Sequence, residues 1–176
     1  GFELKNFKRS VIRNPDYYFK EGITWSTLSS RALSVRYSSI GFIFETKGSM
    51  YFCDDRENSK YILAFLNSKI GTELISIISP TMDYHEGPLG NLPIIMDKNQ
   101  NIDLLVDKNI NISKTDWDSF ETSWDFQRHP ILIHKGESAT IEEAFGNWWD
   151  FAEEQFNRLK VNEEELNRIF IEIYGL

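Results

Sequence analysis

The sequence predicts an α+β fold, in which a small mixed sheet with packed helices is followed by a helical C-terminal segment. Short runs rich in β-branched and aromatic residues, which favour strands, fall within the first hundred residues. Beyond about residue 100, apolar residues recur at spacings of three and four, the period of an amphipathic helix. Apolar residues make up 41% of the 176 residues, which is ample for a buried core. We therefore expect an α+β domain over residues 1–100 and a helical segment over residues 101–176.

Four strands are expected in the first domain. The first three are residues 23–26, 41–46 and 49–53, and a hairpin turn at Lys47 and Gly48 joins the last two. Turn-forming residues then precede an apolar run at 91–95 that contains Pro93, which is typical of an edge strand.

Two helices are expected between these strands. Asn58 or Ser59 is a suitable cap for a helix that continues to about residue 69. Its buried stripe would contain Ile62, Phe65, Leu66 and Ile70. A second apolar run at 74–78 ends before Pro80, because proline cannot continue a helix.

The C-terminal segment contains helical patterns throughout. One helix begins near Ile102. Thr140 and Glu143 form a capping-box pattern that opens a long amphipathic helix from residue 141. Residues 162–165 repeat the cap pattern, which predicts two adjoining helices joined by a bend or a hairpin. Two i,i+4 ion pairs are expected on exposed faces, Glu154 with Arg158 and Glu164 with Arg168.

Composition limits the classes of protein to which the chain can belong. No run of about 18 apolar residues occurs, so no membrane span is expected. The first residues lack a secretory signal pattern, and the abrupt ends of the chain indicate a fragment of a longer protein. Cys53 is the only cysteine, so no internal disulfide can form, and we expect a reducing cytoplasm.

Charge is distributed unevenly along the chain. The formal net charge is −8, which by itself argues against a nucleic-acid-binding protein. Residues 1–50, however, carry 8 Lys/Arg and 4 Asp/Glu, whereas residues 101–176 carry 7 Lys/Arg and 16 Asp/Glu. The basic front and the acidic back are compatible with one face meeting DNA and another meeting solvent or protein.

The basic front also concentrates hydroxyl and aromatic side chains. Phosphate contacts require lysine, arginine and hydroxyl donors, and base recognition uses side chains of the same kinds. Trp25 is expected to be structural. The residues that we predict to contact DNA are Lys8, Arg9, Arg13, Lys20, Thr24, Ser26, Ser30, Arg31, Arg36 and Tyr37.

Catalytic and metal-binding patterns are weak in this chain. Residues 14–17 (NPDY) differ from the Asn-Pro-Pro-Tyr loop of amino-methyltransferases at the third position, and a turn is the better interpretation. Asp16 followed by Glu45 and Lys47 matches a loose pattern of metal-dependent nucleases. The histidines and Cys53 lack metal-ligand spacing. We therefore assign no catalytic or metal-binding residue, and a nuclease domain is kept as a less favoured alternative.

Several segments, taken in order, resemble the C-terminal half of adenine-specific DNA methyltransferases of the BREX phage-defence type (PglX-like), which are related to type IIG restriction–modification enzymes. The first three are YFKEGITWS at residues 18–26, SVRY at 34–37 and GFIF at 41–44. LAFLNSK at 63–69 and GNLP at 90–93 are similar to elements of target-recognition domains. DWDSFETSWDF at 116–126 and NEEELNRIF at 162–170 resemble signatures further along in the BREX-type enzymes.

The resemblance implies a division of labour in the parent enzyme. A separate catalytic domain would bind S-adenosylmethionine and methylate adenine N6, and this chain would be the DNA target-recognition domain with the start of a helical region. The fragment itself would hold no cofactor. Its expected partners are double-stranded DNA, the catalytic domain of the same parent chain and other proteins of the defence system. The alternative from another class is a protein-docking module that uses the acidic, tryptophan-containing segment.

Overall fold

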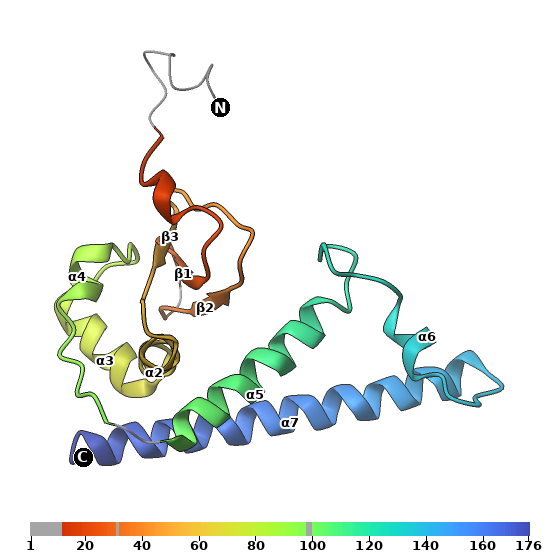
Figure 1. Ribbon diagram of the computed structural model, residues 1–176. Helices are drawn as coiled ribbons and strands as arrows, with labels where there is room; N and C mark the ends of the chain where they lie inside the picture. The colour runs from red at the N-terminus through yellow and green to blue at the C-terminus, as the bar shows by residue number, and fades with distance from the viewer. Residues whose placement is uncertain (1–11, 31, 98–99) are drawn as a thin grey trace. The chain divides into compact units, whose positions relative to one another are not determined.

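The computed structural model describes residues 12–30, 32–97 and 100–176 (Figure 1). The chain forms two compact units. The first extends to Asn67 and resumes over Gly71–Pro93, and the second comprises Ser68–Ile70 and Ile94–Leu176. The predicted α+β class is confirmed, because a three-stranded antiparallel sheet and several helices make up the described residues.

The sheet of the first unit has the order β2-β1-β3. Its central strand is β1 (Gly22–Ser26), with β2 (Val35–Ser38) and β3 (Gly48–Tyr51) as antiparallel neighbours. Ile23 and Trp25 are 0% and 4% exposed, and the Trp25 Nε1–H donates to the carbonyl of Tyr84 at 2.9 Å. Trp25 is therefore a core residue with a satisfied polar group, as the sequence predicts.

Two predicted strands are absent from the structure. Residues 41–44 instead form a loop whose backbone bonds to the turn before β1. The Phe19 N–H donates to the Phe42 carbonyl at 2.8 Å, and the Gly41 N–H donates to the Phe19 carbonyl at 3.1 Å. Residues 91–95 are also not a strand. There the N–H groups of Asn91 and Leu92 bond back to helix α4 (Glu86–Gly90), and Pro93 has no N–H to offer a ladder.

Aromatic side chains hold this loop against the residues that precede β1. Pro15–Tyr17 forms the short 3-10 helix η1, so the turn predicted over residues 14–17 is confirmed. Tyr18 contacts Phe44 at a centroid distance of 5.5 Å, and Phe52 contacts both Phe44 and Tyr17 at 5.3 and 5.0 Å. These contacts explain why an aromatic run with strand-like composition forms a loop.

Helices α2 (Arg56–Asn67) and α3 (Lys69–Ile78) follow β3, and α2 packs on the sheet (Figure 1). The helix α2 begins two residues before the earlier of its predicted caps, and the Asn58 amide donates to the Asp55 carboxylate at 2.9 Å. Within the described residues no single helix is long and apolar enough to cross a membrane. Only residues 58–67 and 69–78 taken together, bent by 74°, reach that length and composition.

Asn67, the last residue of α2, joins the helix to the edge of the sheet. Its Oδ1 accepts from the backbone N–H of Val35 at 3.0 Å, and its Nδ2 donates to the Val35 and Leu63 carbonyls at 2.9 and 3.0 Å. The amide therefore bonds to an edge-strand residue as a neighbouring strand would, while also bonding to its own helix.

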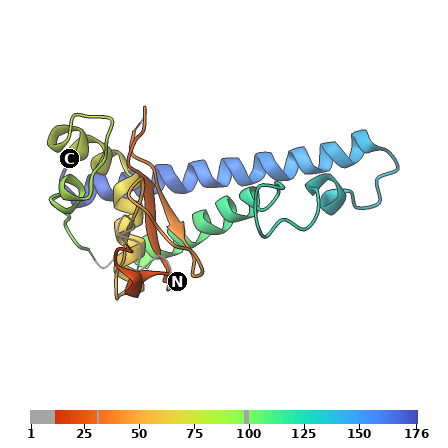
Figure 2. The ribbon, with the colours of Figure 1, turned by 90° about the horizontal axis from the view of Figure 1, so that it is seen from above.

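The second unit is built from α5 (Gln100–Trp117), α6 (Pro130–His134) and α7 (Ile141–Ile173). Figures 1 and 2 show α5 beside the C-terminal half of α7 and α6 beside its N-terminal end. The Thr140–Glu143 capping box is present as predicted, with Glu143 N–H donating to Thr140 Oγ1 at 3.2 Å.

The predicted bend near residue 162 is wrong, because α7 is one helix of 33 residues. Asn162 does not cap a new helix: its Nδ2 donates to Oδ1 of Asn109 on α5 at 2.8 Å. Of the two expected ion pairs, Glu154 with Arg158 forms at 3.8 Å. Arg168 pairs instead with Glu165 and Glu172, and Glu164 lies 4.0 Å from Lys160.

Replacing Asn67 tests the link between α2 and β2. Asn67→Ala should lower the free energy of unfolding by about 1–2 kcal/mol, because the N–H and C=O of Val35 lose their partner. Asn67→Asp should also destabilise, since a carboxylate would face the two carbonyls that now accept from the amide. Urea unfolding monitored by circular dichroism measures both effects. Exposed Asn91 is the matched control, and an equal loss in Asn91→Ala would contradict this role.

Candidate nucleic-acid interface

The strand register divides the sheet residues between two faces. Residues directly opposite one another share a face, and successive residues of one strand alternate. The inner face carries Ile23 and Trp25 with their partners Val35, Tyr37, Ser49 and Tyr51. The other face, which we call the outer face, consists of Gly22, Thr24, Ser26, Arg36, Ser38, Gly48 and Met50.

Three of the predicted site residues lie together on the outer face. Arg36 is directly opposite Thr24, and its Nη2 donates to the Ser26 hydroxyl at 3.2 Å. The Thr24 hydroxyl donates to the carbonyl of Ser49 at 2.9 Å. Ser26 accepts from Arg36 and so keeps its own O–H for an outside acceptor, and the guanidinium keeps its other N–H groups. The donors that remain available in this ordered group are therefore the Ser26 hydroxyl and the Arg36 guanidinium, whereas the Thr24 proton is bonded to the Ser49 carbonyl.

The outer face is free of acidic groups and made largely of small residues. None of the described residues in the three strands is Asp or Glu, although the chain as a whole has a net charge of −8. Gly22 cannot be larger, because a Cβ there would lie 2.6 Å from the carbonyl oxygen of Tyr51. With Gly48, Ser26 and Ser38 beside Arg36, a flat ligand can approach the backbone closely.

The remaining predicted residues are not part of this group. Tyr37 lies on the inner face, where its hydroxyl donates to Glu21 at 2.8 Å; burial and this carboxylate raise the pKa of the Tyr37 phenol. Lys20 lies over the ring of Tyr17, 4.9 Å from its centroid. Arg13 and Ser30 are exposed. Lys8, Arg9 and Arg31 lie outside the described residues, so the prediction for them is untested.

Lys47 is a cation that the sequence analysis did not include in the interface. It precedes Gly48, the partner of Ser26, and its carbonyl accepts from Thr27 N–H at 3.1 Å. Its ammonium group is 3.9 Å from Asp83 Oδ2, and its side chain is 66% exposed. The predicted turn at Lys47 and Gly48 was the available signal, because Lys47 immediately precedes β3, whose first residue, Gly48, is opposite Ser26 at the end of β1.

The nuclease alternative gains no support from the arrangement of Glu45. Its carboxylate accepts from the backbone N–H of Lys47 at 2.9 Å and from the Thr46 hydroxyl at 3.2 Å, so it stabilises its own turn. Among the residues that the structure describes, no group of three or more His, Cys, Asp or Glu side chains is placed to hold a metal ion.

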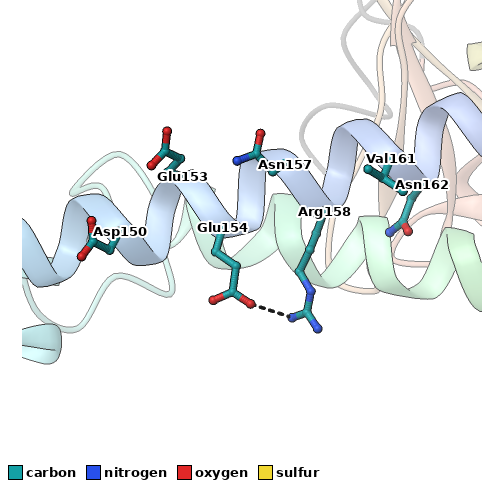
Figure 3. A pocket seen from close by; sticks show the side chains of 7 residues that line it. All are labelled: Asp150, Glu153, Glu154, Asn157, Arg158, Val161 and Asn162. Carbon is teal, nitrogen blue, oxygen red and sulfur yellow. Dashed lines mark ion pairs between the residues drawn. The ribbon is translucent and has the colours of Figure 1, made fainter.

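Two hollows of the described surface are lined by residues of the helical unit and by none of the predicted site residues. Figure 3 shows one along α7, lined by Asp150, Glu153, Glu154, Asn157, Arg158, Val161 and Asn162. A second hollow lies between two helices. It is lined by Gln155, Arg158 and Asn162 of α7 and by Lys108, Asn111 and Ile112 of α5. Neither is an enclosed site for a small ligand.

The loop after α5 is ordered by charged hydrogen bonds. Lys114 Nζ lies 2.6 Å from both Asp118 and Asp125, and the Ser123 hydroxyl donates to Asp118 at 2.6 Å. Two hydrogen bonds lower the pKa of the Asp118 carboxyl. The bond from Lys114 has the larger effect and the bond from Ser123 the smaller one. Between the two anchored residues Ser123 and Asp125, the side chain of Trp124 is 95% exposed. The segment 116–126 therefore has a structural explanation, and both of its tryptophans, Trp117 and Trp124, are exposed.

The comparisons with known proteins show homology to part of larger enzymes. No family model matches the chain. Nearly the whole chain is, however, homologous to part of adenine-specific methyltransferases. One relative, the adenine-specific methyltransferase PglX of Lacticaseibacillus casei (strain Zhang), is 43% identical over 171 residues, 96% of this chain. Another, the adenine-specific methyltransferase BrxX of Escherichia coli O9:H4 (strain HS), is 38% identical over 177 residues, 99% of this chain.

The relationship to PglX-like methyltransferases, indicated by the sequence motifs, is thus confirmed. The chain spans only 14% of the length of each of these relatives.

The Asp118 cluster gives a pH-dependent prediction. Because the pKa of Asp118 is lowered in the folded chain, its contribution to stability is complete above the ordinary aspartate pKa of about 3.9 and is lost as pH falls through the lowered value. Ser123→Ala removes one donor and should raise the titration midpoint of Asp118 toward the ordinary value. Carboxyl carbon NMR measures the midpoint. An unchanged midpoint in the variant would show that Ser123 does not hold the carboxylate in solution.

Proposed function

We propose that the chain is the DNA target-recognition segment of a site-specific adenine-N6 DNA methyltransferase of the BREX or a related restriction–modification type. The observation that carries the proposal is the acid-free outer face of the sheet, with Arg36, Ser26 and Thr24 side by side in an otherwise acidic chain. Homology to adenine-specific methyltransferases over nearly the whole chain supports it.

The side chains of the outer face suit a DNA backbone. A guanidinium is always charged and presents paired N–H groups that match two phosphate oxygens. Ser26 fixes one edge of the Arg36 guanidinium and retains its own hydroxyl proton for a phosphate oxygen. The small neighbouring residues allow close approach. These contacts position the duplex without identifying its sequence, so base recognition falls to the loops beside the sheet, including Ser30.

The methylation chemistry itself would lie in the part of the parent enzyme outside this chain. There the catalytic domain would bind S-adenosylmethionine, which supplies the methyl group, and would receive an adenine turned out of the duplex. The present segment would hold the duplex in register for that domain. Its partners under this proposal are double-stranded DNA, the catalytic domain of the same polypeptide and other defence-system proteins, all in the bacterial cytoplasm.

Removing Arg36 tests the DNA interface. Arg36→Ala should weaken binding to duplex DNA at low salt about five- to tenfold and reduce the slope of log K against log[salt] by roughly 1, because one phosphate contact is lost. Fluorescence anisotropy with a labelled duplex over a series of salt concentrations gives both quantities. The effect should be similar for different DNA sequences, since the contact is to the backbone.

The matched control is Arg158→Ala, which removes an exposed arginine from the helical unit. Its salt dependence should equal that of the unaltered chain. Identical curves for all three proteins, or an equal loss in Arg158→Ala, would contradict the assignment of the outer face to DNA.

The protein-docking alternative has one specific observation in its favour. Trp117, Trp124 and Trp149 are 59%, 95% and 59% exposed, whereas tryptophan side chains are usually packed. Docking and DNA recognition involve different units, so a second function in the helical unit is compatible with the first.

A further inference from the structure

The N-terminal half of α7 carries an apolar stripe that no described helix covers. Its residues follow one another at spacings of four, four, three and four, and therefore lie along one side of the helix. They extend over about 22 Å at 1.5 Å per residue. Four of them are 44–79% exposed. The stripe consists of Ile141, Phe145, Trp149, Ala152 and Phe156.

The stripe is separate from the side of α7 that packs within the unit. Phe151 stacks on His134 at a centroid distance of 4.2 Å, and Trp148 meets His129 at 5.6 Å. Ala144 on the same side is 5% exposed. Each of these residues immediately precedes or follows a stripe residue and so points about 100° away from it. Helix α6 therefore covers one side of α7 and leaves the adjacent aromatic side open.

The charge around the stripe is mostly negative, and Lys160, one turn beyond Phe156, lies 4.0 Å from the carboxylate of Glu164. Residues 136–157 contain six acidic residues and no Lys or Arg. Within the described part of the chain, exposed Glu142 and Glu153, which border the stripe on the side away from α6, form no ion pair. Figure 3 shows Glu153 directed away from Glu154, whose carboxylate faces Arg158. An occupant of the stripe would thus meet apolar side chains edged by unneutralised carboxylates.

We propose that an amphipathic helix from another part of the same methyltransferase polypeptide covers this stripe, with its apolar side on Phe145, Trp149 and Phe156 and its bordering Lys or Arg side chains against Glu142 and Glu153. A straight ridge of side chains at three- and four-residue spacing is the surface against which a second helix packs. Basic border residues complement the carboxylates.

Two observations favour an occupant from the same polypeptide: the length of the related enzymes and the aromatic composition of the stripe. In both relatives 86% of the chain lies outside the match, so most of such an enzyme is available to cover this side of α7. An exposed apolar stripe rich in aromatic side chains is typical of permanent interfaces rather than transient ones. This inference rests on the proposed function only in requiring the longer parent enzyme.

Cysteine accessibility in the full-length enzyme tests the inference. Ala152→Cys places a thiol on the stripe, and Val161→Cys, at a position that is 62% exposed and on the opposite side of α7, is the matched control. Maleimide labelling of each is followed by mass spectrometry of the peptide that contains it, so that Cys53 and other thiols do not interfere. We expect labelling of Ala152→Cys at least tenfold slower than that of Val161→Cys, at every enzyme concentration.

Three outcomes would overturn the inference. Equal labelling rates would mean that the stripe is open in the enzyme. Protection that increases with enzyme concentration would assign the stripe to a second copy, and protection that requires another added protein would assign it to a separate partner.

Reversing the charges of the acidic residues that border the stripe, in the enzyme that carries Ala152→Cys, tests whether the occupant has basic border residues. Glu142→Lys with Glu153→Lys should increase labelling at least fivefold, because like charges would then face one another. Asp150→Lys, on the opposite side of α7, should leave it unchanged. No effect of the double reversal would overturn the basic border of the occupant. These readouts do not involve DNA, so the Arg36 experiment succeeds or fails independently of them.

Discussion

The candidate interface depends on the alternation of side chains along β1. Burial of Ile23 and Trp25 on the inner face, with the indole N–H satisfied by Tyr84, fixes which way every residue of the central strand points. A shift of one residue would exchange the two faces of the strand. Thr24 and Ser26 are therefore directed outward because their neighbours are core residues, and the antiparallel register then brings Arg36 beside them. The polar residues share the outer face because the hydrophobic residues of the same strand are buried on the inner face.

Polar side chains fix the elements around this sheet and within the helical unit. Asn67 ends α2 by bonding to Val35 of the edge strand, and Asn162 bonds to Asn109 between the two long helices. In the loop after α5, Lys114, Asp118 and Ser123 form a charged network. The segments that resemble BREX-type methyltransferases thus contain residues with identifiable structural roles. These structural roles are a reason for the sequence resemblance that does not require any of these residues to touch a target base.

Local chemistry determined which features were predictable from the sequence. The β1 strand, the buried Trp25 and the Thr140 capping box follow from short-range rules, and the structure has all three. Residues 41–44 were mispredicted because their partner is the loop at Phe19 and not a strand, which composition cannot reveal. The bend at Asn162 was mispredicted because its side chain bonds to another helix. Within the site, Thr24, Ser26 and Arg36 were identified as polar donors, but only the register shows that they share a face while Tyr37 lies on the other.

The most direct test of the DNA interface is photo-crosslinking in the full-length enzyme. A benzoylphenylalanine introduced in place of Ser26 lies on the outer face, and one in place of Glu154 lies on α7 as a control. Irradiation in the presence of duplex DNA, followed by mapping of the crosslinked peptide, should join position 26 to DNA and leave position 154 unmodified. Crosslinking at position 154 alone, or at neither position while the enzyme binds and methylates DNA, would contradict the assignment of the outer face to the DNA backbone.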